Sequence, residues 1–164
     1  MIQLPELQKH KSSGFTLLEV LLVVVLISIL AGIVILALNP AKQIADTNNA
    51  QRWSDVNAIL NGTWQFSIDN DGVLPTGIDS VTSSSQVLGT AAAGCDTTCT
   101  ATTTVAACVN LSGDLVADYL VAIPIDPVTG LAANTDYYIN QDANGRITVG
   151  ACDPEQGETI NVTR

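Results

Sequence analysis

The chain has 164 residues, enough for one modest globular domain once about 40 N-terminal residues are assigned to a membrane segment. Its 16 acidic and 6 basic side chains give a net charge of −10, which excludes a basic surface that would neutralise nucleic-acid phosphates. The single histidine, His10, precedes a long apolar run, so no Ser/His/Asp or Cys/His catalytic arrangement can form after that run. The sequence therefore offers no identifiable enzyme chemistry.

The N-terminal apolar run begins at Phe15 and ends at Leu38, and only Glu19 interrupts it. A helix of this length is about 36 Å long, which is sufficient to cross a hydrocarbon core of ~30 Å. Lys9 and Lys11 precede the run, and acidic residues dominate after it. The positive-inside rule therefore predicts that the N-terminus lies in the cytoplasm and the rest of the chain outside.

Three kinds of N-terminal segment contain an apolar run of this kind, and the presence of Glu19 helps to choose between them. An ionisable side chain within the membrane costs about 2.5–3.5 kcal/mol and tends to have a partner and a function. A secretory signal peptide would have a shorter apolar core and a small-x-small cleavage site, which residues 36–40 match poorly. A plain membrane anchor gains nothing from the carboxylate. The third kind is a leader that is cut before the apolar run.

Residues 14–19, Gly-Phe-Thr-Leu-Leu-Glu, with two lysines ahead and the apolar run behind, resemble the N-terminal signal of type IV pilins and type II secretion pseudopilins. In that family a membrane peptidase cuts after the glycine and methylates the new N-terminal residue. The resemblance implies cleavage between Gly14 and Phe15 and N-methylation of Phe15. It also implies that Glu19 is the carboxylate needed for filament assembly.

Cleavage would create a cationic α-amine on Phe15, which a helix places one turn from Glu19. A negative side chain in the first turn also suits the helix dipole. In a filament, the carboxylate of an incoming subunit is expected to meet the Phe15 amine of its neighbour, which offsets the burial of both charges. The alternative is a glutamate that is merely tolerated near the membrane face.

The segment after the apolar run predicts an amphipathic helix from about residue 41 to about residue 68. Asn39-Pro40 indicates either a kink or an N-cap followed by proline at the first helical position. Apolar residues recur at steps of three and four: Trp53, Val56, Leu60, Trp64 and Ile68. This stripe is expected to pack on a sheet of the same domain, with Arg52 and Asp55 among the polar positions off it. Residues 69–72, Asp-Asn-Asp-Gly, are expected to end the helix as a turn.

The four cysteines are Cys95, Cys99, Cys108 and Cys152. In an exported domain two disulfides are the default interpretation, and a zinc site made only of cysteines is the minor alternative. Three connectivities exist for four cysteines, and the close spacing of the first two favours Cys95–Cys99 with Cys108–Cys152. Residues 76–107, rich in Ser, Thr, Ala and Gly, are expected to form a long surface connection that is tied down by Cys95 and Cys99 and has room for short strands.

The C-terminal part predicts a short helix and a small sheet. Residues 115–120 have a helical pattern. Two β-rich runs, residues 137–140 and 147–149, flank Asp-Ala-Asn-Gly at 142–145, and Asn-Gly between such runs is a strong hairpin signal. A last strand is expected at about residues 158–163.

Residues 123–127, Ile-Pro-Ile-Asp-Pro, are expected to form a rigid extended segment, because proline restrains itself and the preceding residue. With the glycine and the tyrosine pair that follow, they resemble a segment of major pseudopilins and short pilins. In some secretion pseudopilins nearby carboxylates and carbonyls bind calcium, so the resemblance makes Asp126, Asp136 and Asp142 candidate calcium ligands. Acidic turn residues are the favoured interpretation, and no cofactor is otherwise expected.

The fold class expected from these elements is α+β and pilin-like. A long N-terminal helix spans the membrane with its first half and packs with its amphipathic second half on an antiparallel sheet of three or four strands. Three parts follow along the chain: a leader at residues 1–14 that is removed, a transmembrane and assembly helix at 15–38, and an exported globular domain at 39–164.

The resemblance implies a structural subunit rather than an enzyme. The hydroxyl-rich loop favours a type IV pilus subunit, which polymerises into a surface filament for adhesion, motility or DNA uptake. The Pro-x-Asp-Pro segment favours a pseudopilin of a type II secretion system, and an unrelated single-pass anchored domain is a remote alternative. The implied partners are other copies of the chain, the prepilin peptidase, an assembly platform and the membrane, with no specific nucleic acid. The expected location is the cytoplasmic membrane and then an extracellular pilus.

Overall fold

The structure is a computed structural model that describes residues 14–164. The predicted leader charges, Lys9 and Lys11, and nearly all of the predicted leader lie outside the described residues. The chain divides into two compact units, residues 1–40 and residues 41–164, and each is described by itself.

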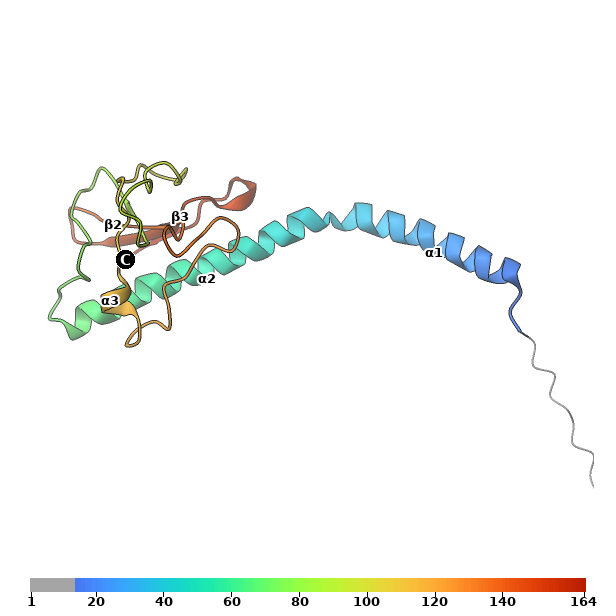
Figure 1. The fold of residues 1–164 in the computed structure, drawn as a ribbon, viewed down its shortest axis with the longest axis horizontal. Coiled ribbons are helices and arrows are strands. Elements are labelled where there is room, and N and C mark those ends of the chain that lie inside the picture. The colour runs from blue at the N-terminus through green and yellow to red at the C-terminus, as the bar shows by residue number, and fades with distance from the viewer. Residues whose placement is uncertain (1–13) are drawn as a thin grey trace, which may run out of the picture. The chain divides into compact units, whose positions relative to one another are not determined.

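The first unit contains α1, Leu17–Leu38 (Figure 1). Thr16 is its N-cap, and the Thr16 hydroxyl accepts a hydrogen bond from the backbone N–H of Glu19 at 3.2 Å. Such a cap satisfies one of the N–H groups that a helix start leaves without an intrahelical partner. By length and composition α1 is able to cross a membrane, as the apolar run predicts.

The second helix, α2, is Pro40–Asp69. Asn39 separates it from the end of α1. Asn39 caps the end of α1 with a positive φ of 41°, a conformation that asparagine tolerates better than most residues. Proline suits the first position of α2 because a helix does not use the N–H groups there. α2 ends within a residue of the predicted stop, where Gly72 has a φ of 87°.

The second unit contains a four-stranded antiparallel sheet of order β1-β2-β3-β4. Its strands are β1 Gln86–Val87, β2 Tyr137–Gln141, β3 Ile147–Ala151 and β4 Asn161–Thr163. β2 and β3 form the predicted hairpin, with Ile139 opposite Val149 and Gly145 at a φ of 81° in the turn. The predicted α+β fold with a small antiparallel sheet is confirmed.

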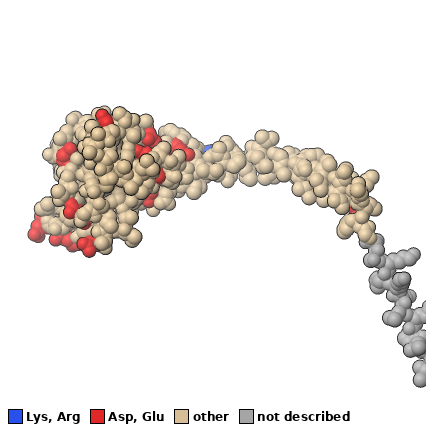
Figure 2. Space-filling model, viewed as in Figure 1, with Lys and Arg blue, Asp and Glu red and all other residues tan. Residues whose placement is uncertain are grey.

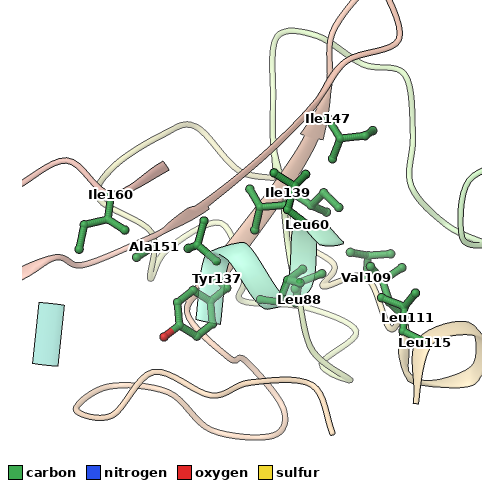
Figure 3. Packing of buried hydrophobic residues seen from close by; sticks show 13 residues of the cluster. Leu60, Leu88, Val109, Leu111, Leu115, Tyr137, Ile139, Ile147, Ala151 and Ile160 are labelled. Carbon is green, nitrogen blue, oxygen red and sulfur yellow. The ribbon is translucent and has the colours of Figure 1, made fainter. Parts of the chain in front are cut away.

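The core lies between α2 and the sheet (Figure 3). From α2 it receives Val56, Ile59 and Leu60, and from the hairpin Tyr137, Ile139, Ile147 and Val149, all fully buried. Each large apolar side chain removed from water in this way contributes about 1.5–3 kcal/mol. The predicted packing of α2 on the sheet is therefore confirmed.

The predicted apolar stripe of α2 is only partly correct. Trp53 is 39% exposed and Ile68 is 75% exposed. Arg52 and Asp55, which were expected off the stripe, are instead buried. The buried face is therefore rotated relative to the prediction, because these two polar side chains find bonded partners inside the domain.

The predicted helix at residues 115–120 is wrong. The helix α3 is Ser112–Leu115, so it ends where the predicted one begins. Leu115 is fully buried, and Ala117 has a φ of 84°. A right-handed helix cannot continue through a residue in that conformation.

The predicted disulfide pairing is also wrong, although all four cysteines form disulfides. The bridges join Cys95 to Cys108 and Cys99 to Cys152. The backbone explains the difference: the Cys95 N–H donates to the Ala106 carbonyl at 3.0 Å, and the Ala101 N–H donates to the Cys152 carbonyl at 3.1 Å. The two close cysteines are thus held against different segments.

The connection at residues 76–107 is less superficial than predicted. It includes β1, and it forms single bridges from Ser85 to Thr104 and from Leu88 to Val109. Val87, Leu88 and Cys95 are buried. The Cys99–Cys152 bridge ties the connection to the residue that follows β3, and the Cys95–Cys108 bridge closes the connection on itself.

Candidate functional site: the predicted processing segment and the globular domain

The predicted processing site lies directly before α1. Gly14 and Phe15 precede the first helical residue and are exposed, with Phe15 83% exposed. A peptide bond outside a helix is accessible to a peptidase, because it is not held by the hydrogen bonds of a helix. The geometry at Gly14–Phe15 is therefore compatible with cleavage at this bond.

Glu19 lies in the first turn of α1. Its backbone N–H is bound by the Thr16 cap, whereas none of the hydrogen bonds and ion pairs found among residues 14–164 includes its carboxylate. The Glu19 carboxylate is therefore available to pair with a cationic group from outside residues 14–164 of the same chain.

The side chains of α1 are exposed on every face of the helix, and none is buried. A helix that is apolar all round needs cover from lipid or from neighbouring helices.

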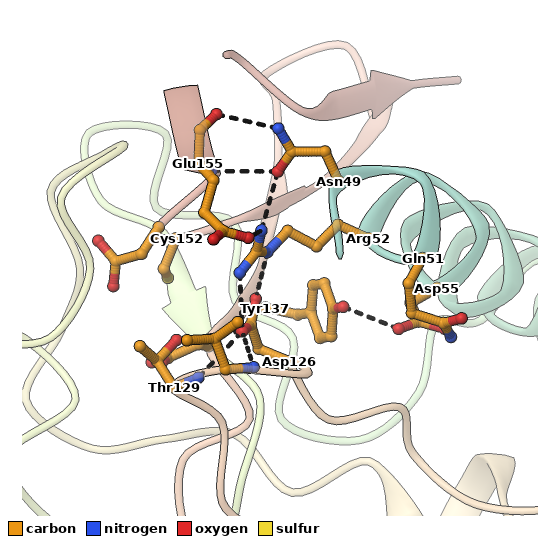
Figure 4. A network of polar contacts seen from close by, with 12 residues as sticks. Asn49, Gln51, Arg52, Asp55, Asp126, Thr129, Tyr137, Cys152 and Glu155 are labelled. Carbon is orange, nitrogen blue, oxygen red and sulfur yellow. Dashed lines mark hydrogen bonds and ion pairs between the residues drawn. The ribbon is translucent and has the colours of Figure 1, made fainter. Parts of the chain in front are cut away.

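A buried ionic network links several segments of the globular domain, residues 41–164 (Figure 4). The Arg52 guanidinium donates to both carboxylate oxygens of Asp126, from Nε to Oδ2 at 2.6 Å and from Nη2 to Oδ1 at 3.1 Å. Its Nη1 donates to Glu155 Oε2 at 2.9 Å and to Asn49 Oδ1 at 2.8 Å. These contacts join α2, the turn at Asp126 and the 3-10 helix Glu155–Gly157.

The Arg52 network was missed by the sequence analysis. The available signal was weak: Arg52 is one of only four basic residues after residue 40, and it shares a helical face with Asn49 and Val56. A polar residue at such a position is usually solvated, so its partners are visible only in three dimensions.

Asp126, a predicted calcium candidate, is held by protein donors. Burial acts to raise the pKa of its carboxyl, but the Arg52 guanidinium and the backbone N–H groups of Val128 and Thr129 outweigh burial, and the pKa lies below its ordinary value. Asp126 Oδ1 accepts the hydrogen bonds from Val128 and Thr129 at 2.9 and 3.1 Å. Asp126 is thus an anionic anchor of its turn.

The other two calcium candidates do not join Asp126 in one site. Asp142 is in the hairpin turn and accepts a hydrogen bond from Arg146 Nε at 2.7 Å. Asp136 is buried, and its Oδ1 has no hydrogen-bond partner. Burial raises the pKa of Asp136, as do the charges of Asp153 and Asp126. Within residues 14–164 no group of three or more His, Cys, Asp or Glu side chains is placed to hold a metal ion.

Asp55 and Tyr137 link α2 to β2. The Tyr137 hydroxyl donates to Asp55 Oδ2 at 2.8 Å, and the Gln51 amide donates to Oδ1 at 2.9 Å. Burial raises the pKa of Asp55, although the two hydrogen bonds oppose that effect. Burial and the neighbouring carboxylate raise the pKa of Tyr137 well above its ordinary value, so its hydroxyl stays protonated. This pair is a second polar tie between the helix and the sheet.

Comparison with known proteins identifies the N-terminal signal and one relative. Residues 9–35 match the family model of the prokaryotic N-terminal methylation motif. Over 65 residues the chain is 42% identical to the type II secretion system core protein G of Aeromonas hydrophila. That match spans 40% of this chain and 44% of the relative. No solved structure matches the chain significantly.

The motif covers the residues that carry the predicted signal, and the relative is a protein of a type II secretion system. The described fold adds a membrane-length helix and a second helix on a four-stranded antiparallel sheet. The matched motif, the relative and the described fold support the resemblance of this chain to type IV pilins and type II secretion pseudopilins.

Proposed function

We propose that the chain is a structural subunit of a type IV pilus. In this proposal α1 anchors the chain in the cytoplasmic membrane, and the subunits then polymerise through α1 into a surface filament. The observation that carries the proposal is the combination in α1 of a fully exposed apolar surface with a single carboxylate, Glu19, in its first turn.

Processing supplies the partner of that carboxylate. Cleavage between Gly14 and Phe15 by a prepilin peptidase leaves a cationic, N-methylated amine at Phe15. The Glu19 carboxylate of one subunit pairs with the Phe15 amine of the next. Because an unpaired ionisable group in an apolar environment costs about 2.5–3.5 kcal/mol on insertion scales, a subunit that is displaced along its neighbour loses this pairing. The pair therefore sets the register of the filament.

The positive-inside rule supports an N-terminus in the cytoplasm, so that the disulfide-bonded domain is exported. Two disulfides fit an oxidising compartment outside the cytoplasm. The assembly platform then acts on the membrane-embedded subunit.

A pseudopilin of a type II secretion system is the second candidate. The observation in its favour is the relative, a core protein of such a system. The part of the hydroxyl-rich connection at residues 76–107 that stays exposed, tied by disulfides through Cys95 and Cys99, favours a filament surface and hence the pilus.

The proposal is tested with cells that lack the chain and are complemented with the wild type, Glu19→Val or the control Ser28→Ala. We expect sheared surface filaments from the wild type and from Ser28→Ala, whose side chain lies on the same helix. Glu19→Val should be cleaved and inserted but should form no filaments. Wild-type filament yield from Glu19→Val would contradict the pairing. Loss of protein secretion without loss of surface filaments in the deletion strain would identify the pseudopilin instead.

A further inference from the structure

The exported domain is strongly self-repulsive. Residues 41–164 contain 14 acidic and 4 basic side chains, a net charge of −10. Figure 2 shows acidic side chains spread over the visible face of this unit, with little basic surface between them. Two copies of such a domain repel each other where their charged surfaces meet. A contact between copies is therefore favoured where the surface has no charge.

One segment provides such a surface. Between Val121 and Leu131 the only ionisable residue is Asp126, which is buried and neutralised by Arg52. Four large apolar side chains of the segment face solvent: Val121 at 98%, Ile125 at 43%, Val128 at 57% and Leu131 at 69% exposed. The four lie within one short segment of the chain, and exposed apolar side chains that cluster mark interaction surfaces more often than single ones do.

An apolar hollow adjoins this segment. Its volume is about 290 Å³, and Ala122, Ile123 and Ile125 of the segment form part of its wall. The rest of the wall comes mainly from residues 88–90 and 109–116, and no ionisable residue lines it. An uncharged hollow of this kind is a surface on which apolar side chains of a protein partner can pack.

The segment is held in a fixed conformation before any partner binds. The Asp126 N–H donates to the Thr135 carbonyl at 3.0 Å, and the Gly130 N–H donates to the Asp126 carbonyl at 3.3 Å. Pro124 and Pro127 restrict the backbone further. A preformed surface loses less conformational entropy on binding than a flexible one does.

We propose that the 121–131 segment and the adjoining hollow form the face on which a second copy of this chain docks in the filament. This inference rests on the proposed function, because polymerisation brings copies of the exported domain together. A helical filament repeats one heterologous contact, so this face meets a different surface of the next subunit. Since the segment is uncharged, the contact forms without placing the acidic surfaces of two copies against each other.

The first test introduces a charge on this face in the full chain. Val121→Asp should lower the yield of sheared filaments by about tenfold or more, because an unpaired charge is then buried in the contact. The control Val81→Asp adds the same charge at a 47% exposed valine outside the segment and should stay within about twofold of the wild type. Val121→Asp filaments at the wild-type yield would overturn the inference.

Two further measurements distinguish a misfolded variant from an incorrect docking face and from an incorrect proposed function. Non-reducing peptide maps should show both disulfides in Val121→Asp, which establishes that the variant domain has folded. A photo-crosslinking amino acid at position 121 should join two copies of the chain in sheared filaments. No crosslink, or a crosslink to a different protein, would overturn the docking face while leaving filament formation intact. If the wild type itself forms no filament, the proposed function fails instead.

Discussion

Arg52 and Asp126 form a bidentate ion pair in the interior of the globular domain, with the Arg52 side chain 1% and the Asp126 side chain 0% exposed. Two nitrogens of the guanidinium each bind one carboxylate oxygen. The pair fixes the turn that precedes β2 against α2. Because the two charges are buried together, removal of either one leaves the other without compensation.

Arg52→Met should therefore destabilise the domain by about 3–5 kcal/mol, the usual loss when one partner of a buried pair is removed. Chemical unfolding of the full chain in detergent, followed by tryptophan fluorescence, measures the change. The matched control is Arg146→Met, which breaks the exposed Asp142–Arg146 pair and should cost less than about 1 kcal/mol. Equal effects of the two substitutions would contradict the assigned importance of the buried pair.

The buried carboxyl of Asp136 should make the stability of the domain depend on pH. Burial raises the pKa of its carboxyl in the folded state, so its contribution to stability is present below the unfolded pKa of about 3.9 and is lost as the pH rises through the folded pKa. Asp136→Asn should stabilise the domain by about 1 kcal/mol at pH 7, because the charged form is no longer buried. At pH 3 the gain should disappear.

Asp142→Asn is the control for that pH dependence. Hydrogen bonds from the Arg146 backbone and side chain lower the pKa of Asp142, so its contribution is present above the unfolded pKa and is lost as the pH falls through the folded pKa. Asp142→Asn should therefore not stabilise the domain at pH 7. Unfolding curves at pH 3 and pH 7 distinguish the two variants, and a pH-independent gain in Asp136→Asn would count against the raised pKa.

The two disulfides should differ in how much they stabilise the domain. Cys95 and Cys108 are 13 residues apart, whereas Cys99 and Cys152 are 53 apart. In the chain-entropy account these loops correspond to about 3 and about 4 kcal/mol. Replacing Cys99 and Cys152 by alanine should thus destabilise the domain by about 1 kcal/mol more than replacing the other pair.

Non-reducing peptide mapping tests the connectivity before the energies are compared. Linked peptides should contain Cys95 with Cys108 and Cys99 with Cys152. Peptides that link Cys95 to Cys99 would show that the spacing, and not the backbone pairing at Ala106 and Cys152, determines the bridges.

Processing makes a prediction that does not depend on the exported domain. Gly14→Val places a branched side chain at the residue after which the family peptidase cuts, and the precursor should accumulate uncut in the membrane. The control Gly113→Val changes an exposed glycine of the exported domain with open space around it, so it should be processed normally. Normal processing of Gly14→Val would contradict the assigned cleavage site.

The elements that the sequence predicted correctly depend on local signals. α2 has helical periodicity and a stop at Gly72, and the hairpin has alternating strands around Asn144-Gly145. Each of these signals lies within a few residues of the structure it produces, so long-range contacts are not needed to interpret it.

The missed features depend on contacts between distant residues. Arg52 is buried because Asp126, 74 positions later, neutralises it. Cys99 pairs with Cys152 because the backbone at Ala101 bonds to Cys152. α3 is displaced because Leu115 is drawn into the core and Ala117 reverses the chain. Periodicity carries no information on such partners. The processing and assembly residues of the N-terminal segment stay predictions.

The N-terminus of the protein isolated from its own cells tests the account most directly. Mass spectrometry should find a chain that begins at Phe15 and carries one methyl group on the α-amine. That result would establish the prepilin pathway and with it the cation that Glu19 requires. A chain that begins at Met1, or after Leu38, would contradict the account, because Glu19 would then have no neighbouring amine and α1 would be an ordinary anchor or a removed signal.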